Sequence, residues 1–341
     1  MTATRAIIVG GGIIGLSIAR ELASRNYHVC LFDKGKVGLE ASSAAAGMLA
    51  PRLEFSPEDD LLGPALESLA LYPEFVREVE QETHREIDLR TDGIVRPSAA
   101  SDTDVCPEGA ERVTGRALQD LLPGLSKEIP VAYFFAGEGS VDNRVLVAAL
   151  GEACRRRGVE VREQQSVHEV LVSGDAVCGV RTDRGEEAAD IVVNCAGAWA
   201  GELQAPAPQL TIRPIKGQML VLRCQPPVAP PRFVIYTHDA YLVPRNDGRV
   251  IVGATVEDVG YDKRVEAWAI TRHLQRAIEL FPAIGAAQVS DYWAGLRPQG
   301  LQKVPQLGGS GPHGYYLATG HYRNGILLAP WTAKTIGDLI S

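Results

Sequence analysis

The stretch that decides the fold is RAIIVGGGIIGLSIARELASRNYHVCLFD, residues 5–33. Residues 5–9 are a short apolar run typical of a buried parallel strand, whereas residues 13–25 repeat apolar side chains with helical spacing. Residues 28–33 predict a second strand. The N-terminus is therefore expected to form a βαβ unit, the building block of a parallel sheet.

The loop between the first strand and the helix carries the spacing Gly10-x-Gly12-x-x-Gly15. Gly10 permits a tight turn, Gly12 lets backbone amides approach a pyrophosphate, and Gly15 allows close packing of the helix on the strand. The positive end of the helix then faces the phosphates. Asp33 ends the second strand, where an acid accepts hydrogen bonds from ribose hydroxyls. These features predict a dinucleotide site, and the loop alone suits NAD as well as FAD.

Further along the chain, parallel βα segments alternate with antiparallel material. We expect helices at 61–84, 144–157, 264–281 and 324–340, strands at 159–163, 167–173, 176–182, 189–195 and 314–318, and an antiparallel sheet within 210–256. This order predicts an α/β fold: a Rossmann-like dinucleotide-binding domain of the glutathione-reductase type, interrupted twice by an α+β substrate domain with an antiparallel sheet. The first domain is expected to comprise residues 1–80, 138–208 and 292–341, and the second residues 81–137 and 209–291.

The composition limits the possible partners. The chain has 341 residues, 45% of them hydrophobic, and a formal net charge of −8. That length suffices for two cores. Nucleic-acid binding is usually accompanied by a basic stripe, and the sequence has only the cluster Arg155-Arg156-Arg157 before Gly158, which we interpret as the last turn of a helix. We therefore expect no nucleic-acid partner; the oligomeric state, including a homo-oligomer, stays open.

Cysteine and apolar patterns bear on the compartment. The six cysteines show no CxxC spacing, and most of them are interpreted as small buried hydrophobic residues in a reducing environment. No apolar run approaches the ~18 residues of a membrane span. Residues 5–19 resemble a short signal peptide, but three consecutive glycines argue against one. We expect a cytoplasmic protein that is not integral to a membrane, and the histidine spacings predict no metal site.

Four further stretches carry a family resemblance: ASSAAAGMLAP at 41–51, IVVNCAGAWA at 191–200, WAGLRP at 293–298 and GHYRNGILLAP at 320–330. Small residues in the first stretch would let backbone amides and hydroxyls reach a pyrophosphate and a flavin ring. Together the stretches resemble the D-amino-acid oxidase family of FAD-dependent oxidoreductases. The last two resemble its glycine oxidase branch, of the thiamine-biosynthesis type.

The resemblance implies FAD, held without a covalent link because no cysteine follows Cys224. The last stretch places backbone amides at a helix start, where they suit the electron-rich edge of a reduced flavin. Together with the glycine loop, the resemblance implies the following cofactor-binding residues: Gly10, Gly12, Ile13, Ile14, Gly15, Asp33, Lys34, Ala41, Ser42, Ala46, Gly47, Met48, Val167, Ala196, Gly197, His321, Tyr322, Arg323, Asn324, Gly325, Ile326 and Leu327.

Four side chains are candidates for the substrate site. The resemblance assigns a carboxylate clamp to Arg297, a hydrogen bond to Tyr241 and a position near the flavin to Arg323, and Met48 would supply an apolar floor. A buried arginine needs a partner, and the alternative for Arg297 is a salt bridge to a distant acid. Tyr241 also suits a packed strand position. His321 is interpreted as a structural brace before a helix rather than as a catalytic base.

The expected reaction is oxidation of glycine or of an N-carboxymethyl amine. A hydride would leave Cα for flavin N5, the imine would hydrolyse to glyoxylate plus ammonia or an amine, and O2 would give H2O2. Open alternatives are a D-amino-acid or sarcosine-type oxidase, and a dehydrogenase that passes electrons to another acceptor. Outside catalysis, a flavin- or NAD-binding module that acts on RNA or as a sensor stays open.

The sequence departs from the family pattern at three places. Asp33 stands where the family usually has the longer Glu. Gly300-Leu301-Gln302-Lys303 replaces a Thr-x-Asp-Gly pattern, which affects the expected pocket rim. Asp239 stands where some relatives have His. These differences leave the choice between free glycine and a larger N-substituted glycine open.

Overall fold

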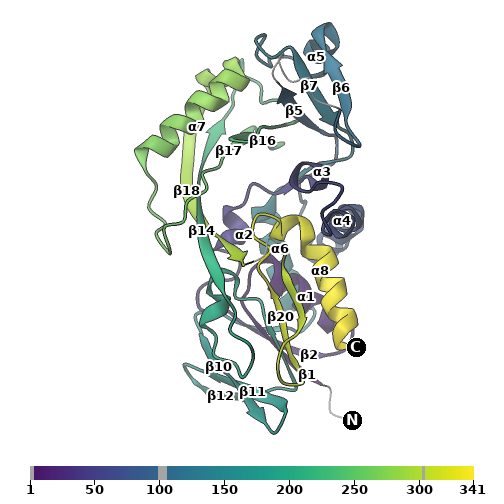
Figure 1. The fold of residues 1–341 in the computed structure, drawn as a ribbon, viewed down its shortest axis with the longest axis vertical. Helices are drawn as coiled ribbons and strands as arrows, with labels where there is room; N and C mark the ends of the chain where they lie inside the picture. Colours follow the sequence, from purple (N-terminus) through teal and green to yellow (C-terminus); the bar gives the residue numbers. More distant parts are fainter. Residues whose placement is uncertain (1–3, 99–105, 302–303) are drawn as a thin grey trace.

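The computed structural model describes residues 4–98, 106–301 and 304–341. The molecule is elongated, with a mostly parallel sheet near the two termini and a larger, mostly antiparallel sheet at the opposite end (Figure 1). Within these residues, no helix combines the length and the apolar character needed to cross a bilayer.

The first sheet grows from the predicted βαβ unit: β1 (Arg5–Val9), α1 (Ile13–Ser24) and β2 (His28–Phe32). Its six strands run in the order β19-β20-β13-β1-β2-β9, and β1 pairs in parallel with both β2 and β13. The remaining strands are β9 (Glu160–Arg162), β13 (Ile191–Asn194), β19 (Gln306–Gly309) and β20 (Tyr315–Thr319).

Helices cover one face of this sheet, because both their apolar sides and the strands have to be buried. α1 packs with α4 (Leu62–Thr83), α6 (Asn143–Arg156) and α8 (Gly325–Ile340) in one core. The other face packs against a three-stranded sheet of β10 (Val167–Ser173), β11 (Ala176–Thr182) and β12 (Gly185–Ala188). This layering matches the predicted Rossmann-like, glutathione-reductase type of architecture.

The second sheet has eight strands in the order β18-β14-β17-β16-β15-β5-β7-β6. All its pairs are antiparallel except β15 with β5, so the expected antiparallel sheet has one parallel pair. The strands are β5 (Ile94–Ser98), β6 (Glu111–Thr114), β7 (Val131–Phe135), β14 (Ile212–Arg223), β15 (Val234–Tyr236), β16 (Tyr241–Pro244), β17 (Arg249–Gly253) and β18 (Gln288–Gly300). One face packs in a core with α5 (Gly115–Leu121), α7 (Ala267–Leu280) and the 3-10 helix η2 (Pro282–Ala286). The other face contributes to a core with Ala46 and Ala50, from the segment after β2.

β14 and β18 form a long ribbon that reaches from the large sheet toward the parallel sheet (Figure 1). Their pairing runs from Ile212 opposite Gly300 to Arg223 opposite Gln288. Of β18, only residues 293–298 belong to a stretch that the sequence singles out. Residues 288–292 are exposed, and their two apolar residues, Val289 and Tyr292, are three positions apart, so no apolar alternation predicts a strand there.

The other predicted helices and strands are found with shifts of a few residues. α7 begins at Ala267 rather than at residue 264, because Glu266 has extended backbone angles, with φ −112° and ψ 143°. The Glu266 backbone N–H donates to the Gln218 side chain at 2.7 Å. Most of the cysteines are buried, as predicted: Cys30, Cys154, Cys195 and Cys224. Cys106 and Cys178 are exposed. The two-domain division stays a prediction; β18 begins within the range assigned to the substrate domain.

A buried carboxyl lies beneath the segment that follows β2. That segment contains α2 (Ala41–Ala44), β3 (Met48–Leu49) and α3 (Pro51–Glu54), and β3 pairs with β8 (Gly139–Val141) next to β4 (Leu89–Arg90). Glu138, just before β8, is fully buried. Its Oε1 accepts the Arg52 backbone N–H at 2.9 Å, and its Oε2 has no partner among the described residues. Burial raises the pKa of Glu138 to about 7, against the opposing effect of Arg52.

Glu138→Gln is expected to stabilise the fold above neutral pH. Because the folded pKa lies above the ordinary 4.5, the folded chain keeps a proton that the unfolded chain releases, and wild-type stability falls as pH rises through this window. Glutamine keeps the acceptor for Arg52 and cannot ionise. Denaturant unfolding from pH 4 to pH 9 should show the variant's advantage growing through the window, up to roughly 3 kcal/mol. A difference that stays constant with pH would contradict this account.

Candidate active site

A cavity of about 800 Å³ lies between the parallel sheet and the ribbon of β14 and β18. Its walls come from the β1–α1 loop, residues 41–50, β14, β16, β18 and residues 318–326. We call residues 41–50 the flavin loop, after the ligand that the sequence predicts. The cavity therefore collects segments from both ends and the middle of the chain.

The glycine loop has the shape that a pyrophosphate needs. Gly10 has φ +105°, and a Cβ there would lie 2.5 Å from the carbonyl oxygen of Cys195. A Cβ on Gly15 would lie 1.9 Å from the carbonyl oxygen of Gly10, so helix and strand meet only because both residues are glycine. Gly12 caps α1 without a side chain, which leaves helix-start amides for an anion. Of these, the Ile13 N–H already donates to Ser42 Oγ at 2.9 Å.

Asp33 supports this loop and lines the cavity. Its two carboxylate oxygens accept the backbone N–H groups of Gly11 at 2.8 Å and Gly35 at 2.7 Å. Burial raises the pKa of Asp33, and the two amides oppose that effect. Since each carboxylate oxygen has two lone pairs, Asp33 keeps acceptor capacity for ribose hydroxyls while it fixes the glycine loop.

An aromatic stack forms one end of the cavity. Lys34 Nζ lies 3.7 Å above the ring of Trp199, and Trp199 stacks on Tyr261 with ring centroids 5.5 Å apart. Trp199 belongs to the 3-10 helix η1 (Gly197–Glu202), and Val167 lines the same cavity. Lys34 is thus engaged by an aromatic face, an arrangement that its sequence neighbours do not reveal.

The flavin loop is held by contacts to its carbonyl oxygens. Asn143 Nδ2 donates to the carbonyl of Ser42 at 2.7 Å. Gly47 has φ +72°, and a Cβ there would lie 2.1 Å from the Val141 carbonyl oxygen, so the position requires glycine. Ala41, Ser42, Ala46, Gly47 and Met48 all line the cavity, as the sequence predicts.

Arg297 lies on the cavity wall without an acidic partner. Its Nη1 donates to the carbonyl oxygens of Thr255 at 3.0 Å and Lys216 at 3.3 Å. Within the described residues, no carboxylate lies within salt-bridge distance of its guanidinium. Gly217 leaves the space that the guanidinium occupies, since a Cβ there would lie 2.3 Å from Nη2. A distant salt bridge, the structural alternative for Arg297, is therefore not formed.

Tyr241 lies beside Arg297 at the same wall. Burial raises the pKa of Tyr241, and Arg297 acts in the opposite direction. The phenol Oη is 3.7 Å from Met219 Sδ. Gly253, paired with Tyr241 across β16 and β17, gives the phenol room, because a Cβ there would lie 2.8 Å from Oη. The phenol therefore stays protonated and available as a donor at neutral pH.

Arg323 differs from Arg297 because it is already paired. Its Nη2 donates to Glu54 Oε1 at 2.7 Å and to Tyr236 Oη at 3.2 Å. Burial lowers the pKa of Arg323, but Glu54 and Tyr236 outweigh that effect and raise it. Its charge is largely compensated, so Arg297 is the better candidate for binding a free carboxylate.

His321 is a brace, as interpreted from the sequence. The ring is buried, and its Nε2 lies 3.0 Å from Thr332 Oγ1 inside α8. Burial lowers the pKa of His321 to about 3. The imidazole is thus neutral at physiological pH and tied to the helix that follows it. Tyr322, with φ +51°, donates its backbone N–H to the Pro298 carbonyl at 2.9 Å and fixes the same loop.

The structure gathers nearly all the predicted site residues around one cavity, including Ala196, Gly197, Asn324, Gly325 and Ile326. Two predicted cofactor residues do not line it. Gly15 serves the helix–strand contact instead, and Leu327 is buried in the core, with its carbonyl accepting from Ser68 Oγ. Their sequence neighbours Ile14 and Ile326 line the cavity, because successive residues of a helix point in different directions.

Four residues of the cavity wall were not predicted from the sequence: Glu54, Trp199, Met219 and Tyr236. Trp199 was quoted within a motif but given no role, and the other three come from separate segments that only folding brings together. Asp239 lines the cavity, but its carboxylate already accepts from Arg276 at 2.9 Å and Thr237 at 3.0 Å. In the departing segment Gly300–Lys303, residues 302 and 303 lie outside the described residues.

Comparisons with known proteins agree with this geometry. Residues 5–339 match the family model described as FAD dependent oxidoreductase. The chain is 38% identical to the bifunctional protein ThiO/ThiG of Synechocystis sp.; the match covers 99% of this chain and 52% of that protein, so the chain spans about half its length. It is 34% identical to the glycine oxidase of Pseudomonas aeruginosa, over 99% of this chain and 94% of that protein.

A solved structure gives the same result. The crystal structure of glycine oxidase from Geobacillus kaustophilus superposes with a TM-score of 0.91 at 32% identity, over 99% of this chain and 95% of that chain. The similarity thus extends through both sheets and the ribbon between them.

Asp33→Ala is expected to weaken FAD binding roughly tenfold to a hundredfold, because the ribose loses a charged acceptor and the glycine loop loses two anchors. Titration of the apoprotein with FAD, followed by flavin fluorescence, measures the dissociation constant. Glu163→Ala is the matched control: Glu163 accepts the nearby Val37 N–H at 2.9 Å but is not in the cavity wall. An unchanged dissociation constant for Asp33→Ala would remove Asp33 from the site.

Proposed function

The chain belongs to the family of FAD dependent oxidoreductases, and on that premise we propose that it oxidises the C–N bond of glycine or of an N-carboxymethyl amine. The substrate loses two electrons and two protons to give an imine. Water converts the imine to glyoxylate and ammonia, or to glyoxylate and an amine. The electrons and protons reduce O2 to H2O2, so the overall reaction balances with one O2 and one water.

The observation that carries this proposal is the acid-free environment of Arg297. Its guanidinium lies on the wall of the cavity, donates to two backbone carbonyls and lies beside the Tyr241 phenol, with no acid at salt-bridge distance among the described residues. A partly buried arginine fork without an anionic partner suits a carboxylate, which it can bind through two hydrogen bonds. Glycine and its N-substituted derivatives carry that group next to the carbon to be oxidised.

The protein's part in the reaction is to bind and orient. Arg297 would hold the substrate carboxylate and Tyr241 would donate a hydrogen bond from its protonated phenol. The Cα hydrogen would leave the neutral amine as a hydride, so no strong base has to remove a proton from Cα. Neutral His321, buried against Thr332, is not needed for that task. When bound, FAD supplies the two-electron acceptor and its reoxidation by oxygen.

The residues around the cavity suit the cofactor. The glycine loop and the start of α1 would hold the pyrophosphate, Asp33 the ribose, and the flavin loop with residues 321–326 the flavin. We propose a non-covalent link. Cys195, the cysteine among the described cavity-lining residues, is buried, and burial raises the pKa of its thiol, so it is not a reactive thiolate.

The apolar lining of the cavity and the cysteines bear on the size of the substrate and on the compartment. The apolar side chains of Met48 and Met219 line the cavity, and Met219 Sδ lies 3.7 Å from Tyr241 Oη, which favours a substrate whose Cα carries no bulky group. The six free cysteines favour a reducing compartment, so the cytoplasm is proposed. The small-molecule substrate and oxygen are the proposed partners.

Arg297→Leu is expected to lower kcat/KM by roughly thirtyfold to several thousandfold, because losing a buried charge partner costs about 2–5 kcal/mol. FAD content and the visible spectrum should stay as in the wild type. Arg297→Lys keeps the charge but not the fork and should recover part of the loss. Competitive inhibition by glycolate, measured in each variant, reports carboxylate binding directly.

Arg323→Leu tests whether Arg323, rather than Arg297, binds the substrate carboxylate. Since Arg323 is paired with Glu54 and Tyr236, its loss should weaken glycolate binding less than the loss of Arg297. Glycolate inhibition that survives Arg297→Leu and disappears in Arg323→Leu would contradict the assignment.

The substrate class is tested by peroxide release. We expect higher kcat/KM for glycine, sarcosine and longer N-carboxymethyl amines than for D-phenylalanine. Some turnover of D-alanine is expected too, because one methylene in an apolar pocket changes binding by only about 1–3 kcal/mol. D-Phenylalanine as the best substrate would favour a D-amino-acid oxidase. Activity with an artificial acceptor and none with oxygen would favour a dehydrogenase.

A further inference from the structure

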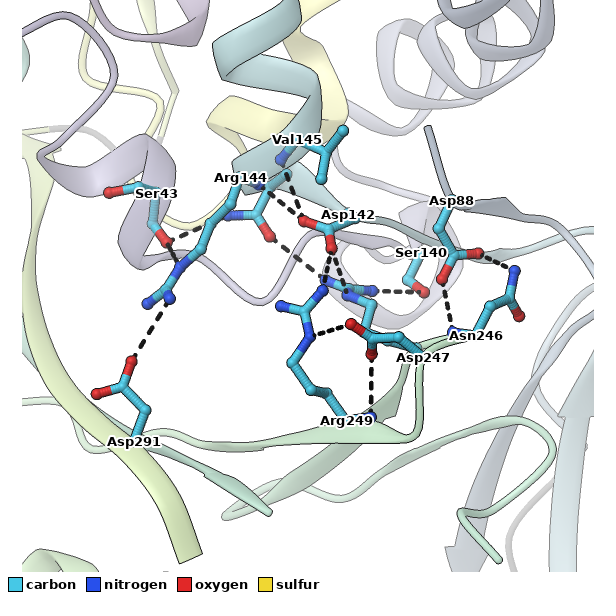
Figure 2. A network of polar contacts seen from close by, with 12 residues as sticks. Ser43, Asp88, Ser140, Asp142, Arg144, Val145, Asn246, Asp247, Arg249 and Asp291 are labelled. Atoms are coloured by element: carbon cyan, nitrogen blue, oxygen red, sulfur yellow. Dashed lines mark hydrogen bonds and ion pairs between the residues drawn. The ribbon is translucent and has the colours of Figure 1, made fainter. Parts of the chain in front are cut away.

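The turn between β16 and β17 crosses from the large sheet to the segment that carries the flavin loop. Asn246 is bound through its backbone N–H and Nδ2 to the carboxylate of Asp88, at 2.9 Å and 2.6 Å (Figure 2). Arg249 Nη2 donates to Asp142 Oδ2 at 2.7 Å, and Asp142 also caps the start of α6. The turn is therefore held rigidly against the other half of the protein.

Arg245, the first residue of this turn, is almost completely buried, with 2% of its surface exposed. Its Nη2 donates to the Ala46 carbonyl at 2.7 Å and to Asn143 Oδ1 at 3.3 Å, and its Nη1 donates to Ser140 Oγ at 3.2 Å. The nearest acid, Asp142, lies 4.0 Å from Nε. A buried cation is costly unless it has such partners; here Nη1 and Nη2 are hydrogen-bonded, and Nε has no hydrogen-bond partner among the described residues. An ion pair with Asp142 alone does not require the contact with the flavin loop.

That contact fixes one peptide group of the loop. A trans peptide is planar, with its N–H opposite to its C=O, so the Gly47 N–H points away from the arginine that holds the Ala46 carbonyl. Ala46 and Gly47 both line the cavity. The Gly47 carbonyl in turn accepts the Val141 N–H at 2.8 Å. Carbonyl groups of the loop are thus held on the protein side, which presents the amide between Ala46 and Gly47 to the cavity.

We propose that Arg245 is a positioning residue for the cofactor: it turns the Ala46–Gly47 peptide so that its N–H addresses the flavin. The proposal rests on FAD binding and is independent of which amine is oxidised. Arg245 itself is not in the cavity wall and acts only through the loop. It directly follows β16, whose first residue is Tyr241, so one strand delivers both a substrate contact and a support for the cofactor.

Arginine suits this position because its planar fork donates in several directions at once. Here one side chain reaches a backbone carbonyl, an amide oxygen and a hydroxyl on three separate residues. Burial lowers the pKa of Arg245 to about 10, so the side chain stays charged at neutral pH. Lysine would keep the charge as a single point and could not maintain all these bonds in the same plane.

The test compares Arg245→Met and Arg245→Lys with Arg249→Met. Arg249 binds the same Asp142 but does not touch the flavin loop, so its variant controls for damage to the charged cluster. Three quantities are measured: the FAD dissociation constant of the apoprotein, the visible absorption spectrum of the holoprotein, and the Tm of the apoprotein. None of them depends on a substrate, so a wrong substrate assignment would leave the outcome unaffected.

We expect Arg245→Met to weaken FAD binding roughly tenfold or more, as for loss of a charge-assisted hydrogen bond that organises a site, and to shift the flavin absorption bands. Arg249→Met should lower Tm while keeping the wild-type FAD affinity and spectrum. Arg245→Lys should fold with a Tm near that of the wild type and still bind FAD more weakly, with a shifted spectrum. If Arg245→Met fails to fold, Arg245→Lys provides the test of the proposal.

The proposal is overturned if Arg245→Lys, or a folded Arg245→Met, binds FAD with the wild-type constant and spectrum. It is equally overturned if Arg249→Met changes both as much as the Arg245 variants do. In either case the arginine only stabilises the cluster around Asp142.

Discussion

The arrangement of the site depends on a close backbone contact between Gly15 and Gly10. There is no room for a Cβ on Gly15, which would lie 1.9 Å from the Gly10 carbonyl oxygen. The contact brings the start of α1 down onto the end of β1, and with it the free amides and the positive end of the helix dipole. Asp33, at the end of the neighbouring strand, then completes the loop by accepting the Gly11 N–H. Everything that would hold a dinucleotide is built outward from this point.

Three arginines near the cavity illustrate how their acceptors decide their roles. Arg297 has no acid partner among the described residues and donates to uncharged backbone carbonyls, so its positive charge is not compensated by the protein. Arg323 has a carboxylate partner in Glu54 and its charge is compensated. Arg245 is surrounded by oxygen atoms of the protein, and the Ala46 carbonyl is the nearest of its acceptors. The residue type is the same in each case, and only the tertiary contacts separate the functions.

Local pattern predicted much of this structure. The βαβ unit, the helices and the glycine loop follow from periodicity and spacing over short stretches, because their determinants are neighbours in the chain. The sequence did not predict the outer part of β18, which is exposed and lacks an apolar alternation, or the stack of Trp199 on Tyr261. Neither could it predict that Glu54 would neutralise Arg323 and that Tyr236 would accept a hydrogen bond from it. These features depend on contacts between distant segments, which no local pattern of residues encodes.

Gly217 and Gly295 face each other across β14 and β18. A side chain on Gly217 would displace the guanidinium of Arg297, and a Cβ on Gly295 would lie 2.4 Å from the Cβ of Ala44 in the flavin loop. During evolution, these two positions are therefore expected to remain glycine. New substrate preferences must arise at wall positions with side chains to exchange, such as Met219 or Tyr236. Diversification of the pocket is thereby directed to positions that carry side chains, while Gly217 and Gly295 are constrained to remain glycine.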